Sequence, residues 1–149
     1  MKRNLITNIL QASLAIIIFS TIAFAQNAAL KGSWNLTGLK QNGGLIDIGA
    51  KGRGGKKLGI NFTDEKRFGL ISTCNAMGGN YTADARGNFK PGAIISTKMF
   101  CGEDLMKIEI ALSNAMQAVT RYEIKNGKLI LRDKSGKNTL TFSRAKTAK

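Results

Sequence analysis

The sequence predicts a mainly β domain that contains one α-helix, which is an α+β fold. Three observations support this fold class. Short stretches in which apolar and polar residues alternate, as they do along strands, recur through most of the chain. The period changes to that of an amphipathic helix over residues 103–119. Strands and helices do not alternate as in a parallel βαβ sheet, so we expect an antiparallel sheet.

The N-terminal residues have the order of a secretory signal peptide. Lys2 and Arg3 precede an apolar run over residues 14–24, and Ala23 and Ala25 form an Ala-x-Ala cleavage signal. We therefore expect cleavage directly after this signal. An uncleaved membrane anchor is the alternative, but the apolar run is shorter than the roughly 20 residues that span a bilayer.

The predicted mature chain begins at Gln26, and residues 26–149 suit a single domain with one core. No stretch after the signal is apolar enough to suggest a membrane span. No cysteine follows the cleavage signal directly, so we do not expect a lipoprotein. We expect a soluble protein of the periplasm or the exterior, with residues 1–25 removed.

The chain is strongly basic, with 23 Lys and Arg residues, 9 Asp and Glu residues and a formal net charge of +14. Removal of Lys2 and Arg3 with the signal lowers this charge to +12. Such a balance favours attraction to anionic surfaces. The basic residues are spread over the chain, which equally fits a solvated basic surface. We do not expect a nucleic-acid partner, because the aromatic residues follow the strand alternation instead of interleaving with a basic stripe.

The strand patterns before the helix differ in strength. A weaker candidate covers residues 93–97, where Pro91 suits the approach to the strand better than its centre. Four stronger candidates show the alternation of a half-buried strand. They are residues 32–39, 43–50, 57–65 and 67–73.

The helix and the strands after it have the clearest patterns. Apolar residues recur at helical spacing over residues 103–119, and Glu103 and Asp104 lie in the first turn, where negative charge favours the helix dipole. After the helix, Asn126-Gly127 suits a two-residue hairpin turn between two alternating stretches. A second turn and one more strand complete a three-stranded meander.

The segment GAKGRGGKK, residues 49–57, contains four glycines and four basic residues, and we expect it to form a mobile turn. Glycine-rich backbone and lysine are able to hold phosphate, but the segment lacks the Gly-x-x-x-x-Gly-Lys-Ser/Thr spacing of a Walker loop. Two interpretations stay open, a solvated hairpin tip or contact with an anionic surface. The candidate contact residues are Lys51, Arg53, Lys56 and Lys57.

The chain contains no histidine and two cysteines, Cys74 and Cys101. Without histidine, Ser-His and Cys-His nucleophile pairs are excluded, and two cysteines alone make a poor zinc site, so we expect no metal. Two cysteines of an exported chain most often form a disulfide. This bond would close a loop of about 28 residues and stabilise the fold by roughly 3 kcal/mol through chain entropy. Two buried free thiols and a redox-active pair are the alternatives.

The segment CNAMGGNY, residues 74–81, is rich in glycine and asparagine, which favour turns. We expect a loop here, with Tyr81 returning the chain to the core. A loop whose exposed backbone groups bind a ligand is the alternative.

Glu109 lies on the apolar face of the predicted helix. If its carboxylate is buried, it needs hydrogen-bond donors, and Asn75 or the backbone amides of residues 74–81 are the candidates. Exposure at the edge of the apolar face is one alternative. A general acid or base is another, but the sequence shows no second carboxylate at a matching position. We therefore expect no catalytic residue.

Five sequence features recur in the order expected of one family. They are GSWNLTGL, TCNAMGGNY, STKMFC, the helix EDLMKIEIALSNAMQAV and YEIKNGKLIL. On these features the chain resembles the META domain family, which includes the heat-shock protein HslJ, over roughly residues 30–144. The resemblance implies a strongly curved, barrel-like antiparallel sheet packed with one helix. It also implies an exported or envelope protein linked to stress or antibiotic tolerance, with no established catalytic activity.

Two functional hypotheses follow. The first is a non-enzymatic exported binding module of the bacterial envelope, monomeric and without a cofactor. The second is an inhibitor or chaperone-like protein that binds another exported protein through exposed loops. The expected partner is therefore an exported protein or an anionic envelope surface. Many members of the family resemble lipoproteins, and this chain differs from them in lacking the lipid-attachment cysteine.

Overall fold

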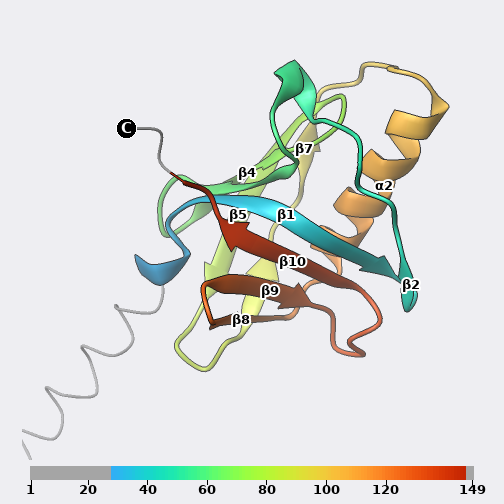
Figure 1. Ribbon diagram of the computed structural model, residues 1–149. Helices are drawn as coiled ribbons and strands as arrows, with labels where there is room; N and C mark the ends of the chain where they lie inside the picture. The colour runs from blue at the N-terminus through green and yellow to red at the C-terminus, as the bar shows by residue number, and fades with distance from the viewer. Residues whose placement is uncertain (1–27, 147–149) are drawn as a thin grey trace, which may run out of the picture.

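The computed structural model describes residues 28–146, which form a curved sheet with one long helix (Figure 1). The predicted signal peptide, residues 1–25, lies outside the described residues. Helix α2 covers Glu103–Gln117, and a short 3-10 helix, η1, covers Arg53–Gly55. The strands are β1 (Gly32–Gln41), β2 (Gly44–Leu45), β3 (Gly59–Phe62), β4 (Arg67–Ile71), β5 (Ala76–Ala83), β6 (Phe89–Pro91), β7 (Ile95–Ser96), β8 (Arg121–Lys125), β9 (Lys128–Arg132) and β10 (Thr139–Arg144).

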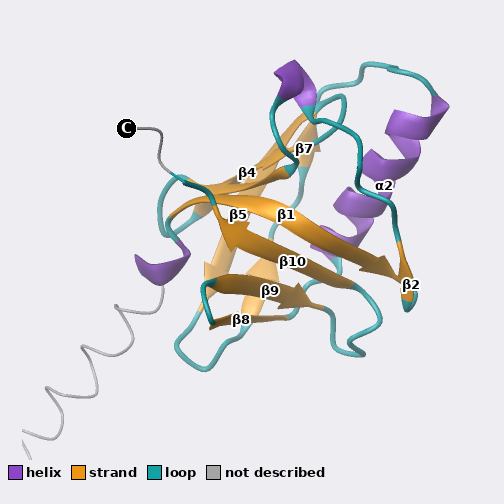
Figure 2. Cartoon of the chain, viewed as in Figure 1, coloured by secondary structure: helices purple, strands orange, loops and turns teal. Residues whose placement is uncertain are grey.

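The strands form one antiparallel sheet that curves until its two edges almost meet (Figure 2). Along the sheet the order is β6-β5-β4-β3-β1-β10-β9-β8, with β2 beside β1 and β7 beside β5. The edge strands β6 and β8 approach each other through a bridge between Asn88 and Arg121. Next to it, the backbone nitrogen of Phe89 donates to the carbonyl oxygen of Thr120 at 2.9 Å. The expected mainly β fold with a barrel-like sheet and one helix is therefore confirmed.

The core lies inside the barrel, where alternate side chains of each strand point inward. Trp34 of β1 is buried, and its indole Nε1 donates to the carbonyl oxygen of Leu30 at 2.8 Å. The guanidinium of Arg144 lies 4.0 Å from the centre of the same ring. Phe62 and Tyr81 pack edge to face, with ring centres 5.0 Å apart. Burial of large apolar side chains such as these stabilises the fold by about 1.5–3 kcal/mol each.

Helix α2 packs against β1 and β10 and covers one side of the barrel (Figure 1). Gly102 precedes it with a φ of 95°, a conformation that favours glycine, and Glu103 and Asp104 lie in its first turn as predicted. The helix ends at Gln117, two residues before the predicted end. Among residues 28–146, no helix has the length and apolar character to cross a membrane. The buried residues of α2 are Glu109, Ala111, Leu112, Ala115 and Met116.

Most of the predicted strands are present, but the strand predicted over residues 43–50 is largely wrong. Only Gly44–Leu45 pairs, with β1, and Ile46 and Ile48 pack against the core from an irregular segment. One-sided burial produces the same alternation as a strand, so the pattern alone does not separate the two. The predicted hairpin turn is confirmed, because Asn126 and Gly127 both have positive φ.

The expectation of a loop at residues 75–80 is also wrong. Ala76–Ala83 forms strand β5, which pairs with β4 and places Gly69 directly opposite Gly78. The glycine at position 78 serves close packing and not a turn, since a Cβ atom there would lie 2.7 Å from the carbonyl oxygen of Phe68. Tyr81, as predicted, enters the core from this strand.

The change Gly78→Ala is expected to lower the free energy of unfolding by about 1–3 kcal/mol, because the added methyl group would press on the carbonyl oxygen of Phe68. Gly69→Ala is the matched control on the partner strand. The atom nearest to its Cβ would lie 3.8 Å away, so this change should be neutral or slightly stabilising. Urea unfolding of both variants measures the difference. Equal stability of the two would contradict the close-packing role of Gly78.

Candidate functional site

A cluster of polar groups lies where the end of β4, the segment before α2 and α2 itself meet. We call it the Glu109 cluster, and it consists of Ser72, Cys74, Asn75, Thr97 and Glu109. Glu109 is only 4% exposed. A buried carboxylate is costly unless hydrogen bonds replace its water. Its partners therefore decide whether this residue is structural or reactive.

The carboxylate of Glu109 accepts hydrogen bonds from the segment that follows β4. Its Oε2 lies 3.1 Å from the backbone nitrogen of Cys74, 2.7 Å from that of Asn75 and 2.7 Å from Ser72 Oγ. Its Oε1 accepts from Asn75 Nδ2 at 2.6 Å. These backbone amides are available because β4 ends at Ile71 and the chain turns toward the helix. The donors are those that the sequence suggests, with Ser72 in addition.

The side chain of Asn75 joins the three segments of the cluster. Its Nδ2 donates to Glu109 Oε1 and also to the carbonyl oxygen of Met99, the latter at 3.2 Å. Its Oδ1 accepts from Thr97 Oγ1 and from the backbone nitrogen of Met99, both at 2.8 Å. Asn75 thus uses both amide donors and two acceptor positions, which is the full capacity of an asparagine side chain. An aspartate here would instead place a second negative charge beside Glu109.

Two opposing effects act on the pKa of Glu109. Burial raises the pKa because desolvation disfavours the charged form, whereas the hydrogen bonds from Asn75, Ser72 and Cys74 lower it. The hydrogen bonds together have the larger effect, and the pKa lies below the ordinary value of 4.5. The carboxylate is therefore ionised at neutral pH. Three of its four hydrogen bonds end on Oε2 and one ends on Oε1.

A disulfide joins Cys74 and Cys101 beside the Glu109 cluster, with the two Cα atoms 5.9 Å apart. Cys74 is buried, and Cys101 lies at the surface directly before α2. The bond ties the segment after β4 to the start of the helix, as the sequence suggests. It also holds the backbone amide of Cys74 over the helix face that carries Glu109. Because both cysteines are bonded, the alternative of two free thiols does not apply.

The basic segment at residues 49–57 is anchored to the same cluster. The backbone nitrogen of Arg53 donates to the carbonyl oxygen of Ser72 at 2.8 Å, and that of Gly52 donates to the carbonyl oxygen of Lys56 at 2.7 Å. The segment is not a hairpin tip, because the backbone forms the η1 turn and docks on the end of β4, but its basic side chains are solvated as that interpretation expects. Contact with an anionic surface stays a prediction. The side chains of Lys51, Arg53, Lys56 and Lys57 are all exposed.

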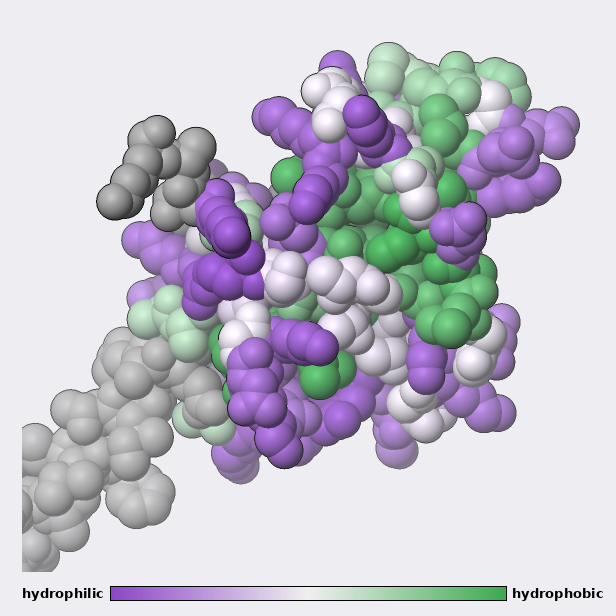
Figure 3. Space-filling model, viewed as in Figure 1, coloured by the Kyte–Doolittle hydropathy of each residue, from purple (hydrophilic) through white to green (hydrophobic). Residues whose placement is uncertain are grey.

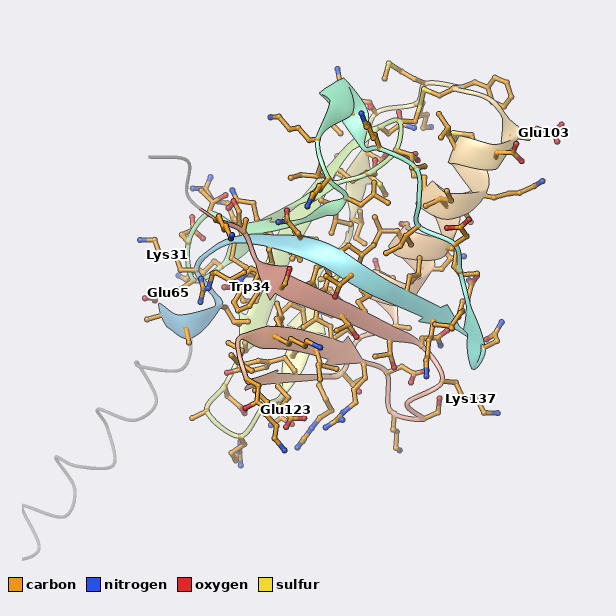
Figure 4. The ribbon with its side chains drawn as sticks, viewed as in Figure 1. Lys31, Trp34, Glu65, Glu103, Glu123 and Lys137 are labelled. Atoms are coloured by element: carbon orange, nitrogen blue, oxygen red, sulfur yellow. A yellow bond between two sulfur atoms is a disulfide. The ribbon has the colours of Figure 1, made fainter. Side chains whose placement is uncertain are left out.

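A surface recess of about 780 Å³ lies beside Tyr81 at one end of the barrel, where Figure 4 labels Lys31 and Glu65. Its wall carries both signs of charge, and Arg67 and Asp64 are paired at 2.8 Å. The hydroxyl of Tyr81 donates to the carbonyl oxygen of Asp64 at 3.0 Å. Burial and the neighbouring acids Asp64 and Glu65 raise the pKa of Tyr81 to about 12, so the hydroxyl stays protonated at neutral pH.

These arrangements offer hydrogen bonding and surface charge. The hydrogen-bond partners of Glu109 include no second carboxylate, so the Glu109 cluster lacks the paired acids of general acid–base catalysis. Across residues 28–146, no three His, Cys, Asp or Glu side chains are grouped so as to hold a metal ion.

Sequence reasoning missed two members of the cluster, Ser72 and Thr97, and the backbone of Met99 that bonds Asn75. Ser72 follows Phe68 and Leu70 at the two-residue spacing of a strand, so the alternation contained a signal for its burial. Thr97 and Met99 carry no such signal. Their contacts with Asn75 depend on the path of the chain between β7 and α2, which local pattern does not determine.

The family model of the META domain matches residues 27–147. The chain belongs to the META domain family. Among curated proteins, no sequence match was found.

Solved structures of other proteins share the fold seen here. An NMR structure of a protein from Burkholderia xenovorans is similar with a TM-score of 0.62 and 24% identity, covering 81% of this chain and 87% of that chain. A DUF4847 family protein from Bacteroides vulgatus is similar with a TM-score of 0.53 and 15% identity, covering 80% of this chain and 96% of that chain. At these identities the similarity shows a common fold.

The change Glu109→Gln in this META domain is expected to lower the free energy of unfolding by about 2–4 kcal/mol at neutral pH. The reason is that an amide NH₂ would face donors that now bond a carboxylate. Asp104→Asn is the control on the same helix, because its side chain is 95% exposed. Its effect should stay below about 1 kcal/mol. Denaturant unfolding measures both.

The pH dependence of the same comparison tests the charge of Glu109. Its pKa in the folded state is lower than the ordinary 4.5, so its contribution to stability is present above pH 4.5 and is lost as the pH falls through the folded pKa. The difference in unfolding free energy between wild type and Glu109→Gln should therefore shrink below pH 4.5. A difference that stays constant with pH would show that the folded protein does not depend on an ionised Glu109.

Proposed function

We propose that this META protein is a non-catalytic, exported binding module of the bacterial envelope that acts in stress or antibiotic tolerance. The barrel is the rigid scaffold, and binding takes place through its surface. The protein acts as a monomer without a cofactor.

The observation that carries the non-catalytic proposal is the bonding of Glu109. Among the residues that the structure describes, Glu109 is the one buried acidic residue. Burial is one way in which active sites shift the pKa of a carboxylate for acid–base catalysis. A general acid or base must reach the substrate with a free position of its carboxylate. Both oxygens of Glu109 instead accept hydrogen bonds from Ser72, Cys74 and Asn75 inside the protein, where the residue is only 4% exposed. Its role is to hold α2 against the barrel.

Two features support export. Disulfides such as Cys74–Cys101 persist in oxidising compartments and are rare in the cytosol. The order of residues 1–25 is that of a secretory signal peptide. The role in stress or antibiotic tolerance follows from the resemblance to the META domain family.

An inhibitor or chaperone-like function is the second candidate, and exposed apolar side chains near the start of α2 favour it. Phe100 is 76% exposed, and its neighbour Met99 is 43% exposed. Exposed apolar side chains that gather in one region mark protein contacts. Capture of a stoichiometric partner from periplasmic extract that is lost with Phe100→Ser, but kept with the control Ile110→Ser on the outer face of α2, would favour this candidate.

Mass spectrometry of the protein from fractionated bacterial cells tests the proposed export. The full chain is expressed, and the mass in the periplasmic fraction is measured with and without reductant. We expect a chain that begins at Gln26, carries no lipid and gains two hydrogens on reduction. An uncleaved chain that stays in the cytosol, or one that carries two free thiols, would overturn the proposal.

A further inference from the structure

Five strands present one outward face on which the strand registers align the side chains in rows. Directly opposed residues of antiparallel strands point to the same side of the sheet. One such row crosses β2, β1, β10, β9 and β8, and at about 4.8 Å per strand it is about 19 Å long. From β2 to β8 its members are Leu45, Lys40, Thr139, Arg132 and Arg121.

The β8–β9 hairpin places like charges opposite each other on this face. Arg121 opposes Arg132, and Lys125 opposes Lys128. Like charges in direct opposition destabilise a sheet. Glu123, labelled in Figure 4, is the one acidic residue of β8 and β9. Its carboxylate lies 3.5 Å from the guanidinium of Arg132 and compensates the charge of that residue. Arg121 donates to Asn88 Oδ1 at 2.7 Å, so the like-charged pair whose presence folding does not favour is Lys125 opposite Lys128.

A recess of about 450 Å³ lies on the same face, over β1, β10 and β9. Lys40 and Lys128 stand at it, and Leu45, which is 77% exposed, lines its side at β2. Figure 3 shows this face with pale residues of intermediate hydropathy over β1 and β10 and hydrophilic residues over β8 and β9. The hydroxyl groups that line the recess belong to Thr37, Thr139 and Thr141.

We propose that this face binds the phosphate groups of an anionic phospholipid surface. Lys40 and Lys128 contact phosphate at the recess, and Leu45 inserts between the headgroups. The proposal names a partner for the binding function proposed above and rests on it.

The combination of charge and an apolar side chain distinguishes a lipid surface from other polyanions. Lysine and arginine attract phosphate on lipid, polysaccharide or nucleic acid alike. An exposed leucine at the end of the cationic row adds little to the binding of a hydrated polyanion, but it gains free energy when buried at the boundary between headgroups and acyl chains. The rows contain no aromatic side chain on which bases could stack.

Co-sedimentation with vesicles tests the proposal. The mature protein is mixed with vesicles of phosphatidylglycerol and phosphatidylcholine, and with vesicles of phosphatidylcholine alone. We expect binding to the first and not to the second, and a decrease of binding with added salt. The double variant Lys40→Glu and Lys128→Glu should weaken binding at least about 25-fold, from about fivefold for each lost lysine. Leu45→Ser should weaken it about tenfold.

A variant with the same change of net charge distinguishes this face from the basic segment at residues 49–57, the other candidate contact with an anionic surface. Lys51→Glu with Lys57→Glu alters the basic segment near η1, which lies far from the β8–β9 hairpin (Figure 1). Salt screens interactions between exposed charges beyond about 10 Å, so that segment has little influence on binding at the proposed face. The affinity of this variant for the anionic vesicles should therefore fall by less than about threefold.

The variant Lys125→Glu separates loss of binding from loss of folding. It turns the like-charged pair of Lys125 and Lys128 into an opposite-charge pair. We expect its unfolding midpoint to rise by about 1–5 °C while vesicle binding falls. A more stable protein that binds less well cannot be explained by misfolding.

Three results would overturn the proposal. They are equal binding to neutral vesicles, equal losses in the Lys40/Lys128 and Lys51/Lys57 double variants, and binding of DNA or an anionic polysaccharide without binding of vesicles. None of them affects the mature mass or the compartment, so a failure of the lipid proposal is distinguishable from a failure of the proposed export.

Discussion

The hydrogen bonding of Glu109 to the chain that follows β4 is the interaction on which the rest of the structure depends. One carboxylate on α2 receives three donors at Oε2 and one at Oε1, and Asn75 extends these bonds to the segment between β7 and α2. The segment after β4 is therefore fixed both to α2 and to the chain that leads into α2. Because the acceptor is charged and buried, loss of any donor leaves charge that is poorly compensated, so the cluster forms as a unit.

The other constraints of the barrel meet at the same point. The disulfide fastens Cys74 to the start of α2, and the η1 turn docks its backbone on Ser72. The disulfide restricts the unfolded chain, whereas the hydrogen bonds act in the folded state, so the two contributions are distinct in origin. The interior thus provides rigidity, and the outward sheet face is left to carry charge. Like-charged pairs on β8 and β9 are tolerated because the interior stabilises the strands that present them.

The sequence predicts those parts of the fold and site that local pattern determines. Alternation predicts the strands around Trp34 and Phe142, helical spacing predicts α2, and Asn126-Gly127 predicts the hairpin. The strand β5 escapes prediction because glycine tolerates both turns and closely packed strands, and only the approach of Phe68 to Gly78 decides between them. Likewise, the position of Glu109 on an apolar helix face predicts that its carboxylate needs hydrogen-bond donors. The hydrogen bonds between Asn75 and the backbone of Met99 depend on tertiary contacts, which local pattern does not predict.

The central claim is that Glu109 is buried, ionised and bonded to the segment after β4. Measurement of the carboxyl carbon shift of Glu109 by NMR over a range of pH tests it most directly. The structure predicts a pKa below 4.5, with the amide signals of Cys74 and Asn75 shifting at the same pH because they donate to the titrating group. A pKa at or above 4.5, or amide signals that do not respond when Glu109 titrates, would contradict the claim.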